Sequence, residues 1–453
     1  MQVFSNVLEM VGKTPMLELK NMDTGSCELF LKLELANPGG SIKDRIGISM
    51  IEEAEKRGDI KPGDTLLEAT AGNTGIGLAL VAAQKGYKLI LVLPDKMSQE
   101  KIFNLRAMGA EVVLTRSDIG KGDPEYYQDV GERLAKERGA YFINQFGNPD
   151  NPLAHEQKTA PEILEQMNGD MDAIVIGAGS SGTVTGISNY LKEHAPNVEI
   201  ILADPVGSVL SNYVNKGELG QSGSWLVEGI GEDFIPPIAD FDRVRKAYPI
   251  RDFESFATAR KLLREEGILA GSSTGTLLAA ALRYCREQTE PKRVVTFACD
   301  TGNKYLSKLF NDFWLEDQGF IRREQHHDLR DLIGRPHDER ATITVGPTDV
   351  LTTAHNRLRN AGFSQLPVMD EGKLVGVVTE DTIIQFVFGK PELMNSPVSD
   401  AMQTAFIKLD KGTSVNNLVS MLHVQPYAAI MDGDEFLGLI TRSDVLNYLR
   451  RQI

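Results

Sequence analysis

The chain has 453 residues, of which 42% are hydrophobic and 25% charged, a composition typical of a soluble globular protein too long for one ordinary core. Its 48 Lys and Arg against 63 Asp and Glu give a formal net charge of −15, which argues against a general nucleic-acid binder or a protein held on an anionic membrane. Because no apolar run reaches the roughly 20 residues of a membrane-spanning helix and no signal peptide is visible, we expect a cytoplasmic protein. The widely spaced Cys27, Cys285 and Cys299 indicate neither a disulfide framework nor a metal site.

From residue 1 to about 320, short apolar runs alternate with longer amphipathic ones. The runs expected to form buried strands are 29–33, 89–94, 173–176, 199–203 and 294–297. The stretches expected to form helices are 46–51, 77–85, 99–108, 183–194, 253–266 and 277–286. This alternation predicts an α/β fold with parallel sheets covered on both faces by helices. Ligands in such folds bind in the loops that leave the C-terminal ends of the strands.

The first glycine-rich loop is residues 37–45, Asn-Pro-Gly-Gly-Ser-Ile-Lys-Asp-Arg. Pro38 and the two glycines break regular structure, so Lys43 lies where the chain turns and starts a helix. A phosphate-binding P-loop would need Gly-Lys-Ser/Thr, whereas here Ser41 precedes Lys43. Lys43 could bind a ligand at this strand end, or it could be a solvated lysine beside a turn, which is the plainer interpretation. This stretch alone does not decide between these two interpretations.

Two further loops of small residues, 68–77 and 270–276, also stand before predicted helices. Such loops expose backbone N–H groups at a helix N-terminus, where a carboxylate or phosphate can bind. Each could equally be an ordinary capped helix start.

The third loop, Gly177 to Thr183, matches the dinucleotide fingerprint G-x-G-x-x-G between a strand and a helix. Asp204 follows at about the spacing of the acidic residue that binds a ribose, so a nicotinamide- or flavin-dependent enzyme is the sharpest alternative. That fingerprint usually opens its domain, whereas this loop lies mid-chain after two others. The same ring of amides can bind any phosphate.

The C-terminal part of the chain repeats itself. Residues 321–336 are strongly charged and have the composition of a linker. Beyond them, Leu374 to Thr379 recurs 62 residues later as Phe436 to Thr441. One copy could hardly bury its sheet alone, so we expect the copies, 337–392 and 393–453, to pack as a pair.

With the four loops in this order, residues 1–320 resemble the fold-type II, β-replacing enzymes that use pyridoxal 5'-phosphate (PLP). The resemblance implies a catalytic domain of two parallel-sheet α/β subdomains. The 62-residue repeat resembles a pair of CBS domains, which are adenosyl-binding regulatory modules. This combination, with the run Glu228 to Pro236, is similar to the cystathionine-forming members of the family more than to the cysteine-forming ones.

The resemblance also implies site residues. Lys43 would hold PLP and then act as the base at the substrate's Cα, and Ser273 would bond to the pyridine nitrogen. A neutral hydroxyl there does not enforce ring protonation, which favours loss of the β-substituent over transamination. The residues implied for the substrate carboxylate are Thr70, Ala71, Gly72, Asn73, Thr74 and Gln145, with Asn73 also reaching the ring hydroxyl. Those implied for the cofactor phosphate are Gly179, Ser180, Ser181, Gly182 and Thr183.

The implied reaction converts L-serine and L-homocysteine into L-cystathionine and water, with release of hydrogen sulfide from cysteine as a side activity. Synthesis of cysteine from O-acetylserine and sulfide is the enzymatic alternative, and a nucleotide-sensing protein on an inactive PLP scaffold is the alternative of another class. Ala71, Phe146 and Glu232 depart from the family's usual Ser, Tyr and Tyr, the last two near the expected second-substrate site. No haem is expected, because the chain begins almost at the catalytic fold.

In the second CBS copy, Thr441 and Asp444 match the ribose-binding pattern of the module, whereas the first copy has Thr382 where the Asp belongs. One adenosyl site is therefore expected, with S-adenosylmethionine as the first ligand to test. The resemblance further implies a homo-oligomer, a dimer or tetramer, that acts on small amino-acid substrates.

Overall fold

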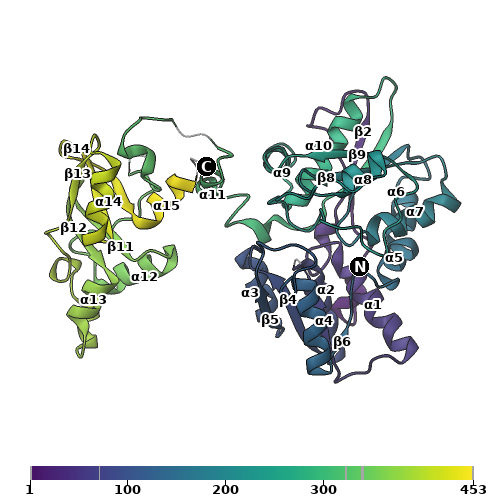
Figure 1. The fold of residues 1–453 in the computed structure, drawn as a ribbon, viewed down its shortest axis with the longest axis horizontal. Helices are drawn as coiled ribbons and strands as arrows, with labels where there is room; N and C mark the ends of the chain where they lie inside the picture. The colour runs from purple at the N-terminus through teal and green to yellow at the C-terminus, as the bar shows by residue number, and fades with distance from the viewer. Residues whose placement is uncertain (1–2, 71, 322–323, 338–340, 451–453) are drawn as a thin grey trace. The chain divides into compact units, whose positions relative to one another are not determined.

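The computed structural model describes residues 3–70, 72–321, 324–337 and 341–450, and the chain forms two compact units, Met1–Asn311 and Asp312–Ile453 (Figure 1). Each unit has its own sheets and its own hydrophobic cores. Among the described residues, no helix is both long enough and apolar enough to cross a membrane.

The larger sheet of the first unit has six strands in the order β1-β2-β10-β7-β8-β9. Their bounds are Met16–Glu18 (β1), Glu28–Lys32 (β2), Ala173–Gly177 (β7), Glu199–Pro205 (β8), Val244–Ile250 (β9) and Arg293–Phe297 (β10). The edge strand β1 pairs antiparallel with β2, and every other pair in this sheet is parallel. The predicted parallel sheet is therefore confirmed, with one antiparallel strand added at its edge.

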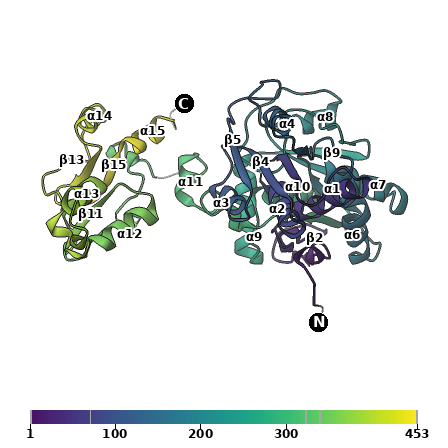
Figure 2. The same cartoon turned by 90° about the horizontal axis from the view of Figure 1, so that it is seen from below.

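The smaller sheet of the first unit is parallel throughout, with strand order β5-β4-β3-β6. Its strands are Thr65–Ala69 (β3), Lys88–Pro94 (β4), Glu111–Thr115 (β5) and Tyr141–Phe142 (β6). Side chains alternate along β4, so Leu91 joins the core under α2 (Asn73–Lys85) while Val92 joins the core under α4 (Tyr127–Arg138). Figure 2 shows these two helices on opposite sides of β4. Both faces of the sheet are thus covered, as the sequence predicts.

The remaining helices of the first unit are α1 (Lys43–Arg57), α3 (Gln99–Ala107), α5 (Asp150–Ala154), α6 (Ala160–Gln166), α7 (Gly182–His194), α8 (Leu210–Lys216), α9 (Asp252–Glu266) and α10 (Ser272–Arg286). Helices α1, α2 and α10 begin at residues 43, 73 and 272, whereas the hydrophobic pattern predicts starts at 46, 77 and 277. Those predicted starts were wrong by about one turn. The first N–H groups of a helix have no intrahelical partner, so glycine and short polar residues can form its first turn although they read as loop.

The second unit contains two similar modules, as the 62-residue repeat predicts. The first has α12 (Leu351–Ala361), β11 (Gln365–Asp370), β12 (Lys373–Thr379) and α13 (Glu380–Val387); the second has β13 (Lys408–Asp410), α14 (Val415–Val424), β14 (Tyr427–Asp432), β15 (Glu435–Thr441) and α15 (Arg442–Arg450). The hairpins β11–β12 and β14–β15 shift register at equivalent positions, after Val368 and Ile430. Leu374 of one module packs with Phe436 of the other in a shared cluster, so the modules form a pair.

The second unit begins at Asp312, with the short helix α11 (Asp312–Asp317). The segment predicted as linker, 321–336, contains a 3-10 helix at Leu329–Leu332. Leu329, Leu332 and Ile333 are buried in the core of the second module, so the end of this segment is packed. The domain boundaries at 320 and 336 stay predictions.

Candidate active site

A cleft of about 400 Å³ in the first unit is lined by residues of all four glycine-rich loops. The predicted site residues that line it together are Lys43, Thr70, Asn73, Thr74, Gln145, Gly179, Ser180, Thr183 and Ser273. Gly72, Ser181 and Gly182 lie in the same loops without lining the cleft. Ala71 lies outside the described residues.

Lys43 is the first residue of α1, and its half-buried side chain lines the cleft. Burial lowers the pKa of its ammonium group, while Cys299, Asp300 and Glu232 act in the opposite direction. A lysine with a lowered pKa is more often present as the neutral amine, the form that attacks carbonyl carbon and accepts protons.

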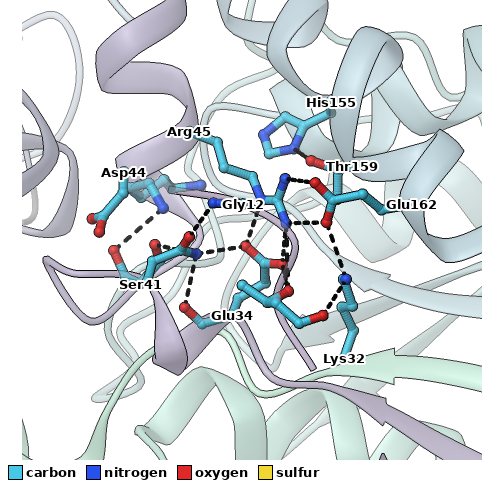
Figure 3. A network of polar contacts seen from close by, with 12 residues as sticks. Gly12, Lys32, Glu34, Ser41, Asp44, Arg45, His155, Thr159 and Glu162 are labelled. Carbon is cyan, nitrogen blue, oxygen red and sulfur yellow. Dashed lines mark hydrogen bonds and ion pairs between the residues drawn. The ribbon is translucent and has the colours of Figure 1, made fainter. Parts of the chain in front are cut away.

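A buried network of ion pairs holds the start of α1 behind Lys43 (Figure 3). Arg45 donates from Nε to Glu34 at 2.7 Å and from Nη2 to Glu162 at 2.7 Å. Lys32 donates to Glu162 at 3.1 Å and to the Thr14 carbonyl at 2.7 Å. Burial by itself would raise the pKa of Glu162, but hydrogen bonds and charge from Arg45, assisted by Lys32, outweigh it and lower that pKa to about 2. Removing one partner would leave buried charge uncompensated.

Two glycines let α1 and α2 cross closely. A Cβ on Gly77 would lie 2.6 Å from the Lys43 carbonyl oxygen, and one on Gly47 would lie 2.7 Å from the Gly77 carbonyl carbon. Because no larger residue fits without displacing backbone, this crossing sets Lys43 against the N-terminal half of α2, the helix that begins with Asn73.

The second loop precedes α2, which begins without a side-chain cap on its first N–H groups. Thr74 donates to Gln145 Oε1 at 2.8 Å, and Gln145 Nε2 donates to the Ala69 carbonyl at 3.0 Å. The backbone N–H of Gln145 in turn donates to the buried Glu68, 3.2 Å away. Burial raises the pKa of Glu68 to about 8, so this carboxyl brings little negative charge at neutral pH. The uncapped helix start suits a carboxylate ligand.

Asn73 is held by two charged residues to which the sequence analysis assigned no role. Its Nδ2 donates to Asp300 at 2.7 Å, and its Oδ1 accepts from Lys304 Nζ at 2.9 Å. Lys304 also donates to the Gly39 carbonyl at 2.8 Å, which ties the first and second loops together. The sequence did hold a signal for these two residues, namely the polar run 300–304 just after the strand at 294–297. The ends of parallel strands carry ligand-binding residues.

The third loop ends at α7, and this helix also begins without a side-chain cap. Ser181 adopts the left-handed conformation, with φ of 68°, to turn the chain into the helix. Asn151 Nδ2 donates to Ser180 Oγ at 3.0 Å and to the Gln145 carbonyl at 2.8 Å. A Cβ on Gly182 would overlap Asn151 Oδ1, a buried oxygen without a partner among the described residues. The loop is therefore a close-fitting turn, and no side chain among the described residues caps the amides at the helix start.

His155 supports this loop from behind. Its Nε2 lies 3.2 Å from Thr183 Oγ1, and its Nδ1 lies 3.0 Å from Thr159 Oγ1. Burial, with smaller contributions from Lys43 and Arg45, lowers the pKa of His155 far below its usual value, so the ring is neutral. The segment His155–Thr159 forms a π-helix, a rare conformation often found at functional sites. Neither Asn151 nor His155 was predicted; the hint was a polar cluster, 148–151, among helical patterns.

Ser273 lies in the first turn of α10 and lines the cleft together with Cys299. Burial raises the pKa of Cys299 to about 12, so its thiol is neutral. This corner of the cleft therefore presents a neutral hydroxyl and a neutral thiol.

Aromatic and acidic side chains form another part of the cleft wall. Phe146 packs edge-on against Tyr127, with ring centroids 6.4 Å apart, and lies 5.7 Å from Phe234. Glu232 and Asp233 line the cleft beside these rings. Of the three unusual residues noted in the sequence, Phe146 and Glu232 are thus both on the cleft wall.

The family model of the pyridoxal-phosphate dependent enzymes matches residues 7–300, and the CBS domain model matches residues 339–389 and 398–451. This chain belongs to the pyridoxal-phosphate dependent enzymes. A cystathionine beta-synthase from Dictyostelium discoideum is 38% identical over 470 residues, covering 99% of this chain and 93% of the relative. The chain is thus a homologue of this synthase along its whole length. It catalyses PLP-dependent β-replacement.

Two solved structures resemble the first unit of this PLP enzyme. A hydrogen sulfide-producing enzyme from Fusobacterium nucleatum is 39% identical with a TM-score of 0.63, covering 67% of this chain and 100% of that chain. An O-acetylserine dependent cystathionine beta-synthase from Helicobacter pylori is 38% identical with a TM-score of 0.63, covering 68% and 99%. Fold-type II architecture is therefore confirmed for this unit.

The cleft of this PLP enzyme fits its cofactor. The uncapped start of α7, behind the Gly179–Thr183 loop, has the free amides that a phosphate needs. Lys43 offers an amine with a lowered pKa. The dinucleotide alternative is wrong for this loop: Asp204 is buried and accepts a hydrogen bond from the Ser211 amide at 2.7 Å, so it is not presented to a ribose.

A second cleft, of about 990 Å³, lies within the CBS unit and is lined by residues of both modules, including Thr379, Thr382, Thr441 and Asp444. Asp444 accepts from the Thr441 backbone N–H at 2.7 Å and from its hydroxyl at 2.6 Å. In the first module, Thr382 and Thr379 instead form a reciprocal capping box. The structure therefore brings the two predicted adenosyl-site residues together at the start of α15.

Proposed function

We propose that this enzyme joins L-serine and L-homocysteine to form L-cystathionine and water. The observation that carries the proposal is similarity over 99% of the chain, both units included, to a cystathionine beta-synthase. Product analysis tests it: purified protein is supplied with serine or O-acetylserine against homocysteine or sulfide, and products are identified by mass spectrometry. Cystathionine from serine and homocysteine is expected, and cysteine from the sulfide pairings with no cystathionine from either homocysteine pairing would contradict the proposal.

We propose roles for the cleft residues on the basis of their positions. When bound, PLP supplies an electron sink that makes the Cα proton of the amino acid removable and the β-substituent expellable. Lys43 holds the cofactor and, once released, removes the Cα proton, tasks that suit an amine with lowered pKa. Lys304 and Asp300 fix the amide of Asn73 toward the cofactor and substrate.

The binding roles follow the helix starts. We propose that Thr70, Ala71, Gly72, Asn73, Thr74 and Gln145 hold the substrate carboxylate at the uncapped N-terminus of α2. Gly179, Ser180, Ser181, Gly182 and Thr183 hold the cofactor phosphate at the N-terminus of α7. Ser273 bonds to the pyridine nitrogen and, being neutral, leaves that nitrogen unprotonated.

A second candidate donor is O-acetylserine, because the similar Helicobacter pylori structure is of an O-acetylserine dependent synthase. Acetate leaves more readily than hydroxide, so the same cleft could use either donor. Release of hydrogen sulfide from cysteine is a proposed side activity, supported by the similar hydrogen sulfide-producing enzyme.

Regulation, assembly and location complete the proposal. We propose that the CBS unit binds an adenosyl ligand, S-adenosylmethionine first among those to test, with Asp444 accepting from the ribose hydroxyls. The enzyme is proposed to be a cytoplasmic homo-oligomer, a dimer or tetramer, and light scattering that finds a monomer at micromolar concentration would contradict this. The catalytic domain is proposed to end near residue 320, followed by the segment 321–336 and the CBS copies 337–392 and 393–453.

A further inference from the structure

Glu232 stands out among the acidic residues of the cleft because its carboxyl has no fixed partner. Its backbone is held on both sides, since its N–H donates to Ser208 Oγ at 3.1 Å and its carbonyl accepts from the Val209 N–H at 2.9 Å. Among the described residues, none forms a hydrogen bond or ion pair with its side-chain carboxyl. By contrast, the neighbouring Glu228 is paired with Lys101 at 2.8 Å and Lys308 at 2.7 Å. The backbone of Glu232 is therefore fixed, while its carboxyl makes no hydrogen bond or ion pair among the described residues.

The carboxyl of Glu232 faces the cofactor loop. Its Oε1 lies 3.7 Å from the position a Cβ would take on Gly179, and both residues line the cleft with Lys43. Phe146 and Tyr127, whose rings belong to a hydrophobic cluster, line the same cleft. Glu232 therefore lies in the same cleft as Lys43 and the loop proposed to hold the cofactor phosphate.

The charges around Glu232 favour its neutral form. Burial is the largest cause, followed by repulsion from Asp233; Lys96 and Lys121 oppose these, and Asp204 adds to them, so the pKa of Glu232 rises to about 8. The other titratable groups that interact with it are Lys43, Tyr126 and Tyr127. Because the pKa is raised, the group carries a proton below about pH 8 and can also lose it near neutrality, which suits both halves of an acid–base cycle.

The proposed reaction needs such a cycle. Hydroxide is a poor leaving group, so breaking the Cβ–O bond of serine requires a proton on the departing oxygen. The thiol of homocysteine must afterwards lose its proton as the S–Cβ bond forms. Lys43 already takes the Cα proton, and a second acid would spare it from protonating the leaving group as well.

We propose that Glu232 donates its proton to the departing hydroxyl of serine and then accepts the proton of the incoming thiol. The Cβ–O electron pair leaves with oxygen as water, and the thiol's proton restores neutral Glu232, so the residue is unchanged after each turnover. Lys43 returns its proton to Cα. This inference rests on the proposed function and assigns a catalytic residue to it.

The leaving group provides the test. Glu232→Gln keeps the shape of the side chain but cannot donate an acidic proton, so cystathionine formation from serine should fall about a hundredfold. With O-acetylserine, whose acetate leaves without a proton, the same variant lacks only the acceptor for the thiol proton, so the loss should be smaller, about tenfold or less. In the wild type, kcat/KM for serine should fall above about pH 8 as Glu232 loses its proton. The variant should not show this fall. Asp118→Asn is the matched control, because Asp118 lines the same cleft and is paired with Arg116 at 2.6 Å; it should affect both donors alike.

A readout independent of turnover is infrared titration of the holoenzyme. Subtracting Glu232→Gln from wild type removes the signals of other carboxyls, including Glu68, whose raised pKa lies in the same range. A protonated-carboxyl band lost with a midpoint near pH 8 is expected. Equal losses with serine and O-acetylserine, or no such band, would overturn the inference. If wild type makes no cystathionine from either donor, the proposed function itself fails instead.

Discussion

Two parts of the cleft wall, the cofactor end and the side-chain wall, are made of different chemical groups. The cofactor end is made of backbone amides at helix starts, glycines that allow close approach, and neutral side chains such as Ser273 and Cys299. The side-chain wall, another part of the cleft, is made of aromatic rings and ionisable side chains, among them Phe146 and Glu232. We expect the backbone geometry of the cofactor end to hold the cofactor, and the side chains of the side-chain wall to influence which β-substituent leaves and which thiol enters.

The largest effect is expected on removing Lys43, which we propose both holds the cofactor and acts on the substrate. Lys43→Ala should abolish cystathionine formation, by at least about a thousandfold, because the variant has neither the cofactor's anchor nor the base. Circular dichroism should show an intact fold. Mass-spectrometric product assays and the visible absorption of the bound cofactor are the measurements, and wild-type turnover would refute the central assignment.

Gly182→Ala tests whether backbone fit governs the cofactor end. The new Cβ would overlap Asn151 Oδ1, and Asn151 cannot easily move because its amide is held by Gln145 and Ser180. We expect the affinity of apoenzyme for PLP to fall about a hundredfold, measured by fluorescence titration. If affinity is unchanged, the close fit at this turn does not matter. The stabilising shift in thermal midpoint on adding PLP should shrink in parallel.

The ion-pair network behind Lys43 predicts a pH dependence of stability. The pKa of Glu162 is lowered to about 2 in the folded state, so its contribution is full above its ordinary value of 4.5 and is lost as pH falls toward 2. The shift corresponds to at most about 3 kcal/mol of unfolding free energy. Urea unfolding at several pH values should show Glu162→Gln less stable at pH 7, with the gap closing below pH 4. A gap independent of pH would point to packing alone.

Ser273→Asp tests the neutral character of the cofactor end. A carboxylate beside the pyridine nitrogen would favour its protonation and divert electrons into the ring, so β-replacement should fall about tenfold while the cofactor stays bound. Steady-state rates and absorption spectra report the two effects separately. Unchanged turnover with an intact spectrum would count against the role of Ser273.

The CBS unit gives the last prediction, because its two modules carry different residues at equivalent positions of the second cleft. Thr382 takes part in a capping box, whereas Asp444 offers a carboxylate, one oxygen of which accepts from the Thr441 N–H and hydroxyl; both residues line the cleft. Asp444→Ala should weaken S-adenosylmethionine binding about tenfold by calorimetry. No heat from wild type up to millimolar ligand would reject the site, and equal heat from both proteins would move it elsewhere.

The sequence by itself determined what depends on local pattern. Alternating apolar and amphipathic runs specified parallel sheets, and glycine-rich loops located helix starts to within about one turn. The 62-residue repeat predicted two similar modules, and their hairpins share a register shift. These features can be read locally because strand and helix periodicity, and the need for glycine at a tight turn, act over a few residues.

The tertiary structure decided what depends on contacts between distant segments. Asn73 meets Asp300 and Lys304, and Thr183 meets His155, only after the chain has folded. The first turns of α1, α2 and α10 looked like loop because helix starts tolerate small polar residues. The state of Glu232 is also invisible in sequence, since its raised pKa comes from burial and from charges that different loops bring around it.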